Sequence, residues 1–324
     1  MDRSLYIIDG HAQIYRAYYA VIGLRSPAGE PTSATFGFVG MLLKLLQGRK
    51  PSHVVLTMDA GTSGREAVDA SYKAQRKPMP EDMPQQIERI LQIVAALNMP
   101  VFMAEGYEAD DSMATLIRKV RTDAACGDCK IYMCTKDKDL DQLIDDKCVM
   151  YDIQSDEEIN AAGLVAKKGY SPSQARDVLA LTGDAVDNIP GIPGVGPKTA
   201  AKWIGQYGSI DNLIAHKEEI GGKIGEAFRA NLHVLENSRK LVELQFDVPI
   251  PAMDWEAAKV HPERLPELAP LFQQLGFSRM TALLEQVVNQ YRDMMPAGVK
   301  VAKIAVPASA PPPPRPVKER IAET

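Results

Sequence analysis

The first half of the sequence repeats one pattern four times: a short apolar run that ends in an acidic side chain at a turn. The runs cover residues 5–8, 53–58, 99–103 and 130–135. The acids that follow them are Asp9, Asp59, Glu108 with Asp110 and Asp111, and Asp137 with Asp139. Helical segments separate the runs, such as the amphipathic stretch that begins at Asp82 and Pro84. This alternation predicts an α/β fold with a mainly parallel, doubly wound sheet.

The position of the acids predicts a functional site, because ligands of such sheets bind beyond the carboxyl ends of the strands. A single aspartate at a strand end is most simply a turn residue. Acidic clusters at four successive strand ends exceed what turn preference explains, since that preference would also bring in asparagine, serine and glycine. Carboxylates without a convergent histidine or cysteine select Mg²⁺ or Mn²⁺ rather than zinc.

Residues 181–202 combine two further acids with a glycine-rich turn. Asp184 and Asp187 are three residues apart, so on a helical turn they would face the same way. The turn that follows contains Gly194 and Gly196 and opens into a predicted helix over residues 198–207. Backbone N–H groups at such a helix start bind a phosphate without reading a base. The two features together predict a metal-dependent enzyme that acts on a nucleic-acid backbone.

Residues 61–83 have no apolar periodicity and carry positive charge. The basic side chains are Arg65, Lys73, Arg76 and Lys77, and Tyr72 lies among them. One interpretation is a solvated loop or a mobile helical segment, and the other is an element that grips phosphate above the active site. The residues alone favour neither interpretation.

The sequence pattern changes twice after the acidic cluster of Asp137 and Asp139. From Ser171 the pattern is mostly helical, and residues 295–324 are rich in alanine, proline, valine and lysine without a periodic face. Such a composition is typical of a linker or a disordered tail. We therefore expect an α/β core over residues 1–170, a helical subdomain over residues 171–294 and a tail over residues 295–324.

The composition sets broad limits on function. A hydrophobic content of 45% and a charged content of 24% are typical of a soluble globular protein, and no apolar run is long enough to span a membrane. This predicts a cytoplasmic protein. The net charge of −5 argues against nucleic-acid binding through bulk charge, so basic side chains must gather along a groove. Cys126 and Cys129 have zinc-like spacing, but no second pair follows, and a turn is the simpler interpretation.

These motifs together resemble the 5′-nuclease domain of bacterial DNA polymerase I, within the flap-endonuclease superfamily, over about residues 5–284. The stretches that carry the resemblance are YIIDGHAQIYRAYYAV at 6–21, MDA at 58–60, YKAQRKPMP at 72–80, GYEADD at 106–111, TKDKDLDQL at 135–143, LTGDAVDNIPGIPGVGPKTAAKWI at 181–204 and LENSRKLVEL at 235–244. The resemblance implies a PIN-like nuclease core, a helical arch near residues 61–83 and a helix–three-turn–helix motif over residues 182–204. One departure is Gly64, which stands where the family has an aromatic residue before Arg65.

The resemblance also implies a site for two Mg²⁺ or Mn²⁺ ions. The ligands of the first ion would be Asp9, Asp59, Glu108 and Asp110. The ligands of the second ion would be Asp137, Asp139 and Asp187, with Asp110 shared between the two. Asp111 and Asp184 would act through water or through the ligands themselves. Lys73 and Arg76 match the basic pair of the family's arch, which contacts the scissile phosphate.

The remaining implications concern DNA. The residues expected to contact it are Arg16, Tyr72, Gly191, Gly194, Gly196, Lys198, Thr199 and Lys202, and the loop around residues 191–199 would hold K⁺ through main-chain carbonyls. The implied activity is that of a 5′–3′ exonuclease and 5′-flap endonuclease, which hydrolyses phosphodiester bonds by a two-metal mechanism in Okazaki primer removal and DNA repair. The implied partners are flapped, nicked or gapped duplexes, RNA primer ends and a polymerase domain in the full-length protein. We expect a monomer at the nucleoid.

A rival hypothesis from another class is a non-catalytic module with a nuclease-like fold, which would hold branched DNA for a partner. Such a module would be expected to have lost one or more metal ligands. All the acids of the pattern are present here, so the sequence favours the enzyme.

Overall fold

The fold is built around a six-stranded sheet, which we describe from a computed structural model of residues 3–124 and 126–292. The strand order is β3-β2-β1-β4-β5-β6. The strands are β1 (Ser4–Asp9), β2 (His53–Thr57), β3 (Val101–Phe102), β4 (Lys130–Cys134), β5 (Cys148–Asp152) and β6 (Glu157–Ile159). Only β6 runs antiparallel to its neighbour, so the predicted mainly parallel sheet is confirmed. The sequence pattern misses β6 because this edge strand is short and largely polar.

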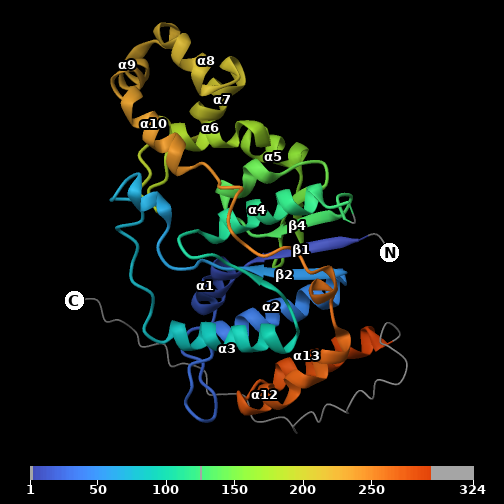
Figure 1. The fold of residues 1–324 in the computed structure, drawn as a ribbon. Coiled ribbons are helices and arrows are strands. Elements are labelled where there is room, and N and C mark those ends of the chain that lie inside the picture. The colour runs from blue at the N-terminus through green and yellow to red at the C-terminus, as the bar shows by residue number, and fades with distance from the viewer. Residues whose placement is uncertain (1–2, 125, 293–324) are drawn as a thin grey trace, which may run out of the picture.

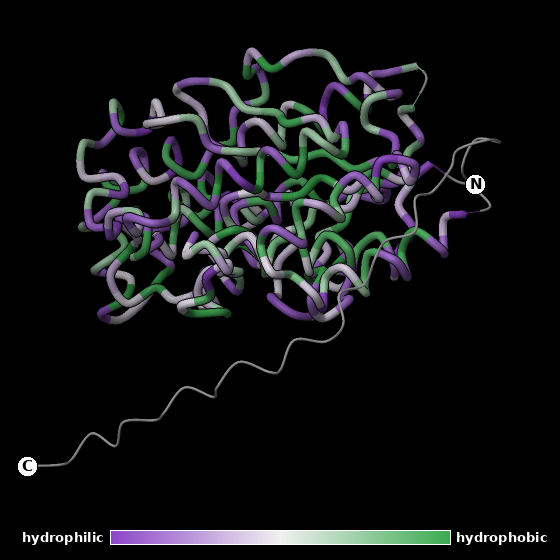
Figure 2. The backbone as a smooth tube through the Cα atoms, turned by 90° about the horizontal axis from the view of Figure 1, so that it is seen from below, coloured by the Kyte–Doolittle hydropathy of each residue, from purple (hydrophilic) through white to green (hydrophobic). Residues whose placement is uncertain are grey.

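Helices cover both faces of the sheet (Figure 1). The helices of the α/β region are α1 (Gly10–Ala20), α2 (Ser33–Arg49), α3 (Met83–Ala96) and α4 (Ala109–Thr122). Strand β1 is apolar on both sides, as a central parallel strand must be. Leu5 and Ile7 belong to the hydrophobic cluster that includes α4, whereas Tyr6 and Ile8 belong to the cluster that includes α2 and α3. Figure 2 shows the hydrophobic stretches running through the middle of the molecule.

The chain reverses direction in the sheet between β1 and β4. It builds β2 and β3 on one side of β1 and then crosses to build β4 and β5 on the other side. The carboxyl ends of these parallel strands lie at one edge, where the crossing leaves a crevice. Asp9 ends β1 and is level with Thr57 of β2. This topology brings the predicted acidic clusters to one place.

A helical region follows the sheet and lies beyond α4 (Figure 1). Its helices are α5 (Ala161–Lys168), α6 (Pro172–Thr182), α7 (Pro197–Tyr207), α8 (Ile210–Ala215), α9 (Gly222–Ala230) and α10 (Leu232–Leu241), with a 3-10 helix at Lys217–Glu219. The chain then returns to the sheet through α11 (Trp255–Ala258), a 3-10 helix at Pro262–Leu268, α12 (Ala269–Gln274) and α13 (Ser278–Gln290).

Two boundaries differ from the expectation. The last helices pack in the hydrophobic cluster of α2 and α3, so they extend the α/β core rather than the helical subdomain expected over residues 171–294. Residues 61–82 contain a 3-10 helix at Gly64–Ala67 followed by turns, where the resemblance implied a helical arch. The tail expected over residues 295–324 lies outside the described residues. None of the described helices is both long and apolar enough to cross a membrane.

Candidate metal centre and nucleic-acid interface

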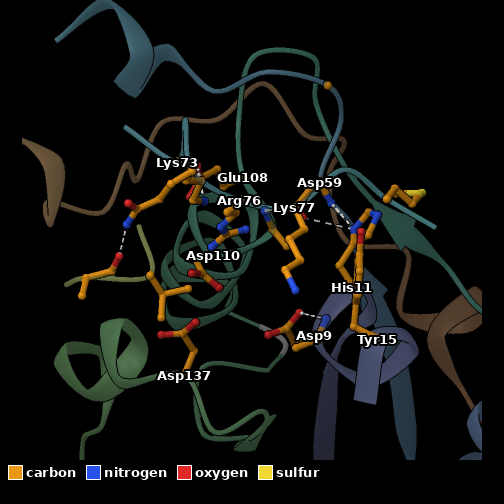
Figure 3. A pocket seen from close by; sticks show the side chains of 17 residues that line it. Asp9, His11, Tyr15, Asp59, Lys73, Arg76, Lys77, Glu108, Asp110 and Asp137 are labelled. Carbon is orange, nitrogen blue, oxygen red and sulfur yellow. Dashed lines mark hydrogen bonds and ion pairs between the residues drawn. The ribbon is translucent and has the colours of Figure 1, made fainter. Parts of the chain in front are cut away.

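Acidic side chains from four strand ends meet in one pocket of about 900 Å³. Asp9 ends β1 and Asp59 follows β2, while Asp110 lies in the first turn of α4 and Asp137 follows β4. Figure 3 shows Asp9, Asp110 and Asp137 pointing toward a common space. The pocket is also lined by Glu108, which caps the start of α4. The structure thus brings together acids that are up to 128 residues apart in the sequence (137 − 9).

Three of these carboxylates are close enough to share a cation. One oxygen from each of Asp110, Asp137 and Asp139 lies within 4.8 Å of the others. Burial raises the pKa of Asp110 well above its ordinary value, and the charges of Asp137 and Asp9 add to the rise. Burial likewise raises the pKa of Asp9 and of Asp139 to about 7. A divalent cation would relieve this repulsion, and an all-carboxylate set matches the preference of Mg²⁺ and Mn²⁺, so the residues fit such ions.

Hydrogen bonds fix the orientation of the first two acids. Thr135 Oγ1 donates to Asp9 Oδ2 at 2.9 Å, and the Ala12 N–H donates to Asp9 Oδ1 at 3.2 Å, which makes Asp9 the N-cap of α1. The Ala109 N–H at the start of α4 donates to Asp59 Oδ1 at 2.7 Å. These bonds leave each carboxylate with lone pairs that can face a cation.

Among the pocket residues that the sequence interpretation missed are His11 and Tyr15. They are four residues apart and share one face of α1, and the signal that could have found them is their place in the helix that Asp9 caps. The Asp59 N–H donates to His11 Nδ1 at 3.1 Å. The same nitrogen lies 3.2 Å from Asp59 Oδ2, so His11 contacts both the main chain and the side chain of this acid.

Asp184 and Asp187 reach the rim of the pocket from a turn rather than from a helix. The predicted common helical face is wrong, because α6 ends at Thr182 and paired backbone hydrogen bonds join Asp184 to Ile189. Asp184 accepts a hydrogen bond from the Val186 N–H and pairs with Lys138 Nζ at 3.0 Å. Ala185 and Val186, between the two acids, line the pocket.

The basic pair of residues 61–82 lies against two of these acids. Lys73 Nζ is 2.6 Å from Glu108 Oε1, and Arg76 Nε donates to Asp187 Oδ1 at 3.0 Å. Burial would raise the pKa of Glu108, but the charges of Lys73 and Arg65 outweigh this effect and hold the pKa below its ordinary value. The Lys73 N–H also donates to the Asp187 carbonyl at 2.9 Å. Both basic side chains line the pocket, where Figure 3 labels them.

Three predicted site residues have other roles in this structure. Asp111 is only 1% exposed, and Arg65 binds both of its carboxylate oxygens, so in this structure it forms a buried ion pair. Tyr72 is 3% exposed and donates to Glu108 Oε2 at 3.2 Å, which buries the ring that was expected to contact DNA. Arg16 pairs with Asp152 Oδ1 at 2.7 Å, outside the pocket lining.

The predicted phosphate-binding turn lies between α6 and α7. Gly194 has a φ of 82°, a conformation that glycine adopts at low cost, and Gly196 caps α7. Lys198 and Lys202 are exposed and four residues apart, so they share one face of α7, next to the half-buried Thr199. Gly191 packs against the end of α6, where an added Cβ would lie 2.6 Å from Gly183 N.

Comparison with known proteins places both halves of the chain. Residues 4–169 match the model of the 5′-3′ exonuclease N-terminal resolvase-like domain, and residues 170–265 match that of the 5′-3′ exonuclease C-terminal SAM fold. A 5′-3′ exonuclease of Aquifex aeolicus is 35% identical over 90% of this chain and 97% of its own length. DNA polymerase I of Rhizobium leguminosarum is 37% identical over 86% of this chain, which spans only 28% of that relative.

Solved structures share the fold at low sequence identity. The T5 5′-exonuclease with bound divalent metal ions (zinc) aligns with a TM-score of 0.61 and 19% identity, over 90% of this chain and 99% of that one. The catalytic core of Rad2 in complex with DNA substrate aligns with a TM-score of 0.59 and 17% identity, over 88% and 93% of the two chains. With these matches, the chain belongs to the 5′–3′ exonuclease family, as the resemblance of its motifs implied.

Proposed function

We propose that this protein is a structure-specific 5′ nuclease, which hydrolyses phosphodiester bonds as a 5′–3′ exonuclease and a 5′-flap endonuclease. The observation that carries the proposal is the cluster of Asp110, Asp137 and Asp139, at the topological switch point of a sheet of this family. Raised carboxylate pKa values in a pocket are typical of a functional site.

The acids would hold two divalent cations, Mg²⁺ or Mn²⁺. The first set is Asp9, Asp59, Glu108 and Asp110, and the second is Asp137, Asp139 and Asp187 with Asp110 shared. When bound, such a pair of cations lowers the pKa of an attacking water and stabilises the leaving oxygen. Asp184 supports the second set from the pocket rim, through the hydrogen bond it accepts from the Asp187 N–H at 3.4 Å.

Two basic side chains of the protein, Lys73 and Arg76, would act on the phosphate. Lys73 and Arg76 extend into the pocket and hold carboxylates that the divalent cations would take over. Once released, the ammonium and the guanidinium would be free to neutralise the charge that develops on the phosphate oxygens. Two cationic side chains that line the same pocket as the acids favour a phosphodiester as the substrate.

The DNA duplex would be bound by a different element from the pocket in which the phosphodiester bond is cleaved. The turn of Gly194 and Gly196, with Lys198 and Lys202 on α7, offers main-chain N–H groups and two exposed charges to a DNA backbone. Thr199 would complete this element, and the main-chain carbonyls of the loop around residues 191–199 would hold a K⁺. Such contacts recognise shape rather than base sequence, which suits flapped, nicked or gapped duplexes and RNA primer ends.

The biological setting follows from the relatives. DNA polymerase I relatives continue well beyond the region matched here, so a polymerase domain is the expected partner of this nuclease. We place the protein at the nucleoid, as a monomer that removes Okazaki primers and acts in DNA repair.

The proposal is tested with end-labelled 5′-flap, nicked and blunt duplexes incubated with the purified protein and Mg²⁺. We expect products with a 5′ phosphate and cleavage near the flap junction. Asp137→Ala and Asp187→Ala should each abolish cleavage while duplex binding persists. Cleavage retained in both variants would overturn the metal assignment, and binding without cleavage by the unmodified protein would favour the non-catalytic module.

A further inference from the structure

Arg65 is a buried arginine whose partners come from two distant parts of the chain. It lies in the 3-10 helix Gly64–Ala67 and is 7% exposed. Its Nη1 and Nη2 donate to the two oxygens of Asp111 at 2.6 and 2.8 Å. Its Nε donates to the Leu241 carbonyl at 2.9 Å, and Nη2 also donates to the Glu243 carbonyl at 2.8 Å. The guanidinium therefore joins α4 to the end of α10 and to the segment that follows it.

Asp111 also contacts the segment that follows α10. Asp111 Oδ1 also accepts a hydrogen bond from the Gln245 N–H at 2.8 Å. Main-chain groups of residues 241–245 thus bind both members of the ion pair. We name the set of Arg65, Asp111 and residues 241–245 the arginine lock. It ties together three parts of the chain: residues 61–82, the first turn of α4 and the end of the helical region.

The arginine lock lies directly behind the acids of the pocket. Asp111 follows Asp110 in α4, and Arg65 Nη1 is 3.4 Å from Oε2 of Glu108, the N-cap of that helix. The Gly64 N–H donates to the Gly106 carbonyl at 3.0 Å, which fixes the loop that enters α4. The position of Glu108 and Asp110 therefore depends on groups that do not line the pocket themselves.

We propose that Arg65 is a positioning residue, which acts through Asp111 and Glu108 to set the first turn of α4 for divalent-metal binding. A buried ion pair is weak evidence for stability alone, because desolvation offsets most of the attraction. The ion pair contributes more by fixing geometry. The planar guanidinium binds a carboxylate and two carbonyls at once, whereas a lysine ammonium cannot present its donors in this fixed planar arrangement. The absence of the family's aromatic residue before Arg65 leaves this geometry intact.

The experiment compares Arg65→Lys and the nearly isosteric Asp111→Asn with the unmodified protein. This inference rests on the proposed nuclease function, so Mn²⁺ binding is measured by titration without DNA, and kcat and KM are measured separately on a 5′-flap substrate. We expect the Mn²⁺ concentration for half-saturation to rise about tenfold or more in both variants. We expect kcat to fall by a similar factor, while KM for DNA changes less than about threefold because the lysines of α7 are untouched.

The matched control is Arg176→Met, which removes an exposed ion pair between Arg176 and the side chain of the same Glu243. It should leave Mn²⁺ binding and kcat unchanged. If Arg65→Lys and Asp111→Asn only lower the melting temperature and keep the Mn²⁺ affinity and kcat of the unmodified protein, the positioning role is wrong. A failure of the proposed function would look different, since the unmodified protein would then bind no Mn²⁺ and cut no flap.

Discussion

At the scale of single residues, the carboxylates around the pocket differ in what neutralises them. Glu108, Asp184 and Asp187 each have a lysine or arginine within ion-pair distance. Asp59 lies beside His11, and within the described residues the other four acids form no ion pair: Asp9, Asp110, Asp137 and Asp139. The demand for an added cation is therefore greatest at these four, between the ends of β1 and β4.

Asp152 shows the opposite electrostatic situation on a neighbouring strand, β5. Burial would raise the pKa of Asp152, but Arg16 and Lys136, both within 2.7 Å, outweigh it and hold the pKa well below its ordinary value of 3.8. A depressed pKa means that the ionised carboxylate stabilises the fold above pH 3.8, and that this stabilisation is lost as the pH falls toward the folded-state value.

We therefore predict that Asp152→Asn lowers the free energy of unfolding by about 1–3 kcal/mol at neutral pH. The difference between variant and unmodified protein should shrink below about pH 4, where the carboxylate begins to protonate in the unfolded chain. Urea unfolding of both proteins at pH 7 and at pH 3 measures this difference in the free energy of unfolding. An equal difference at both pH values would mean that the ion pairs of Asp152 do not stabilise the fold.

Adjacent acids in the sequence could not be assigned individually. Asp110 and Asp111 are neighbours with the same chemistry, and what separates their roles is Arg65, which comes from 46 residues upstream. Tyr72 likewise could not be identified as a buried residue, because the segment around it has no periodic apolar pattern. In such cases, only the contacts made in the folded protein distinguish a residue that would bind the metal from one that holds other residues in place.

At the scale of elements, the connection between α6 and α7 joins the pocket to the expected duplex-binding surface. Two glycines lie back to back in it: an added Cβ on Gly183 would lie 2.5 Å from Gly191 N. Gly183 has a φ of 66°, and the Ile192 N–H donates to the Leu181 carbonyl at 2.8 Å. This close packing fixes Asp184 and Asp187 on one side and Gly194 on the other.

Gly191→Ala should disrupt this connection. The new Cβ would meet the backbone of Thr182 and Gly183, so we expect a loss of about 1–3 kcal/mol in the free energy of unfolding and weaker duplex binding. The matched control is Gly205→Ala in α7, where an added Cβ meets nothing within 4 Å outside the helix's own backbone and alanine favours the helix by about 0.5–1 kcal/mol. Thermal melts and DNA titrations of both variants test this prediction. Equal melting temperatures and equal duplex affinities of the two variants would refute the packing argument.

Elements with a strong periodic or apolar pattern were predictable, and elements defined by tertiary contacts were not. The buried strand β1 and the amphipathic helix α3 lie where the sequence indicates. The turn of residues 184–187 looked like a helix continuation, because its acids have helical spacing, yet Gly183 ends α6. Residues 61–82 owe their conformation to hydrogen bonds with distant groups, such as the one from Asn188 Nδ2 to the Ser71 carbonyl.

At the scale of the whole molecule, net charge and DNA binding have to be reconciled. The chain carries a net charge of −5, and five of its 42 acidic residues line one pocket. The exposed lysines of α7 lie on a different element, so local positive charge can meet a DNA backbone despite the overall balance. The strand order, which carries four acidic strand ends to one edge, achieves this separation.

Duplex binding should consequently weaken as salt is added, and should not depend on base sequence. We predict that Lys198→Ala and Lys202→Ala each weaken binding and reduce the slope of log Kd against log salt concentration by about one. Fluorescence anisotropy with two unrelated duplexes at several salt concentrations measures this. Unchanged slopes in both variants would place the duplex on another surface.

The central claim is that the acidic pocket binds divalent cations, and an equilibrium Mn²⁺ titration followed by electron paramagnetic resonance tests it most directly. We predict about two Mn²⁺ ions per chain, and a loss of affinity of about tenfold or more in Asp110→Asn, because this carboxylate belongs to both ligand sets. Asp211→Asn, which alters an exposed acid paired with Arg239, should bind Mn²⁺ as the unmodified protein does. No saturable Mn²⁺ binding, or equal binding by Asp110→Asn, would contradict the account.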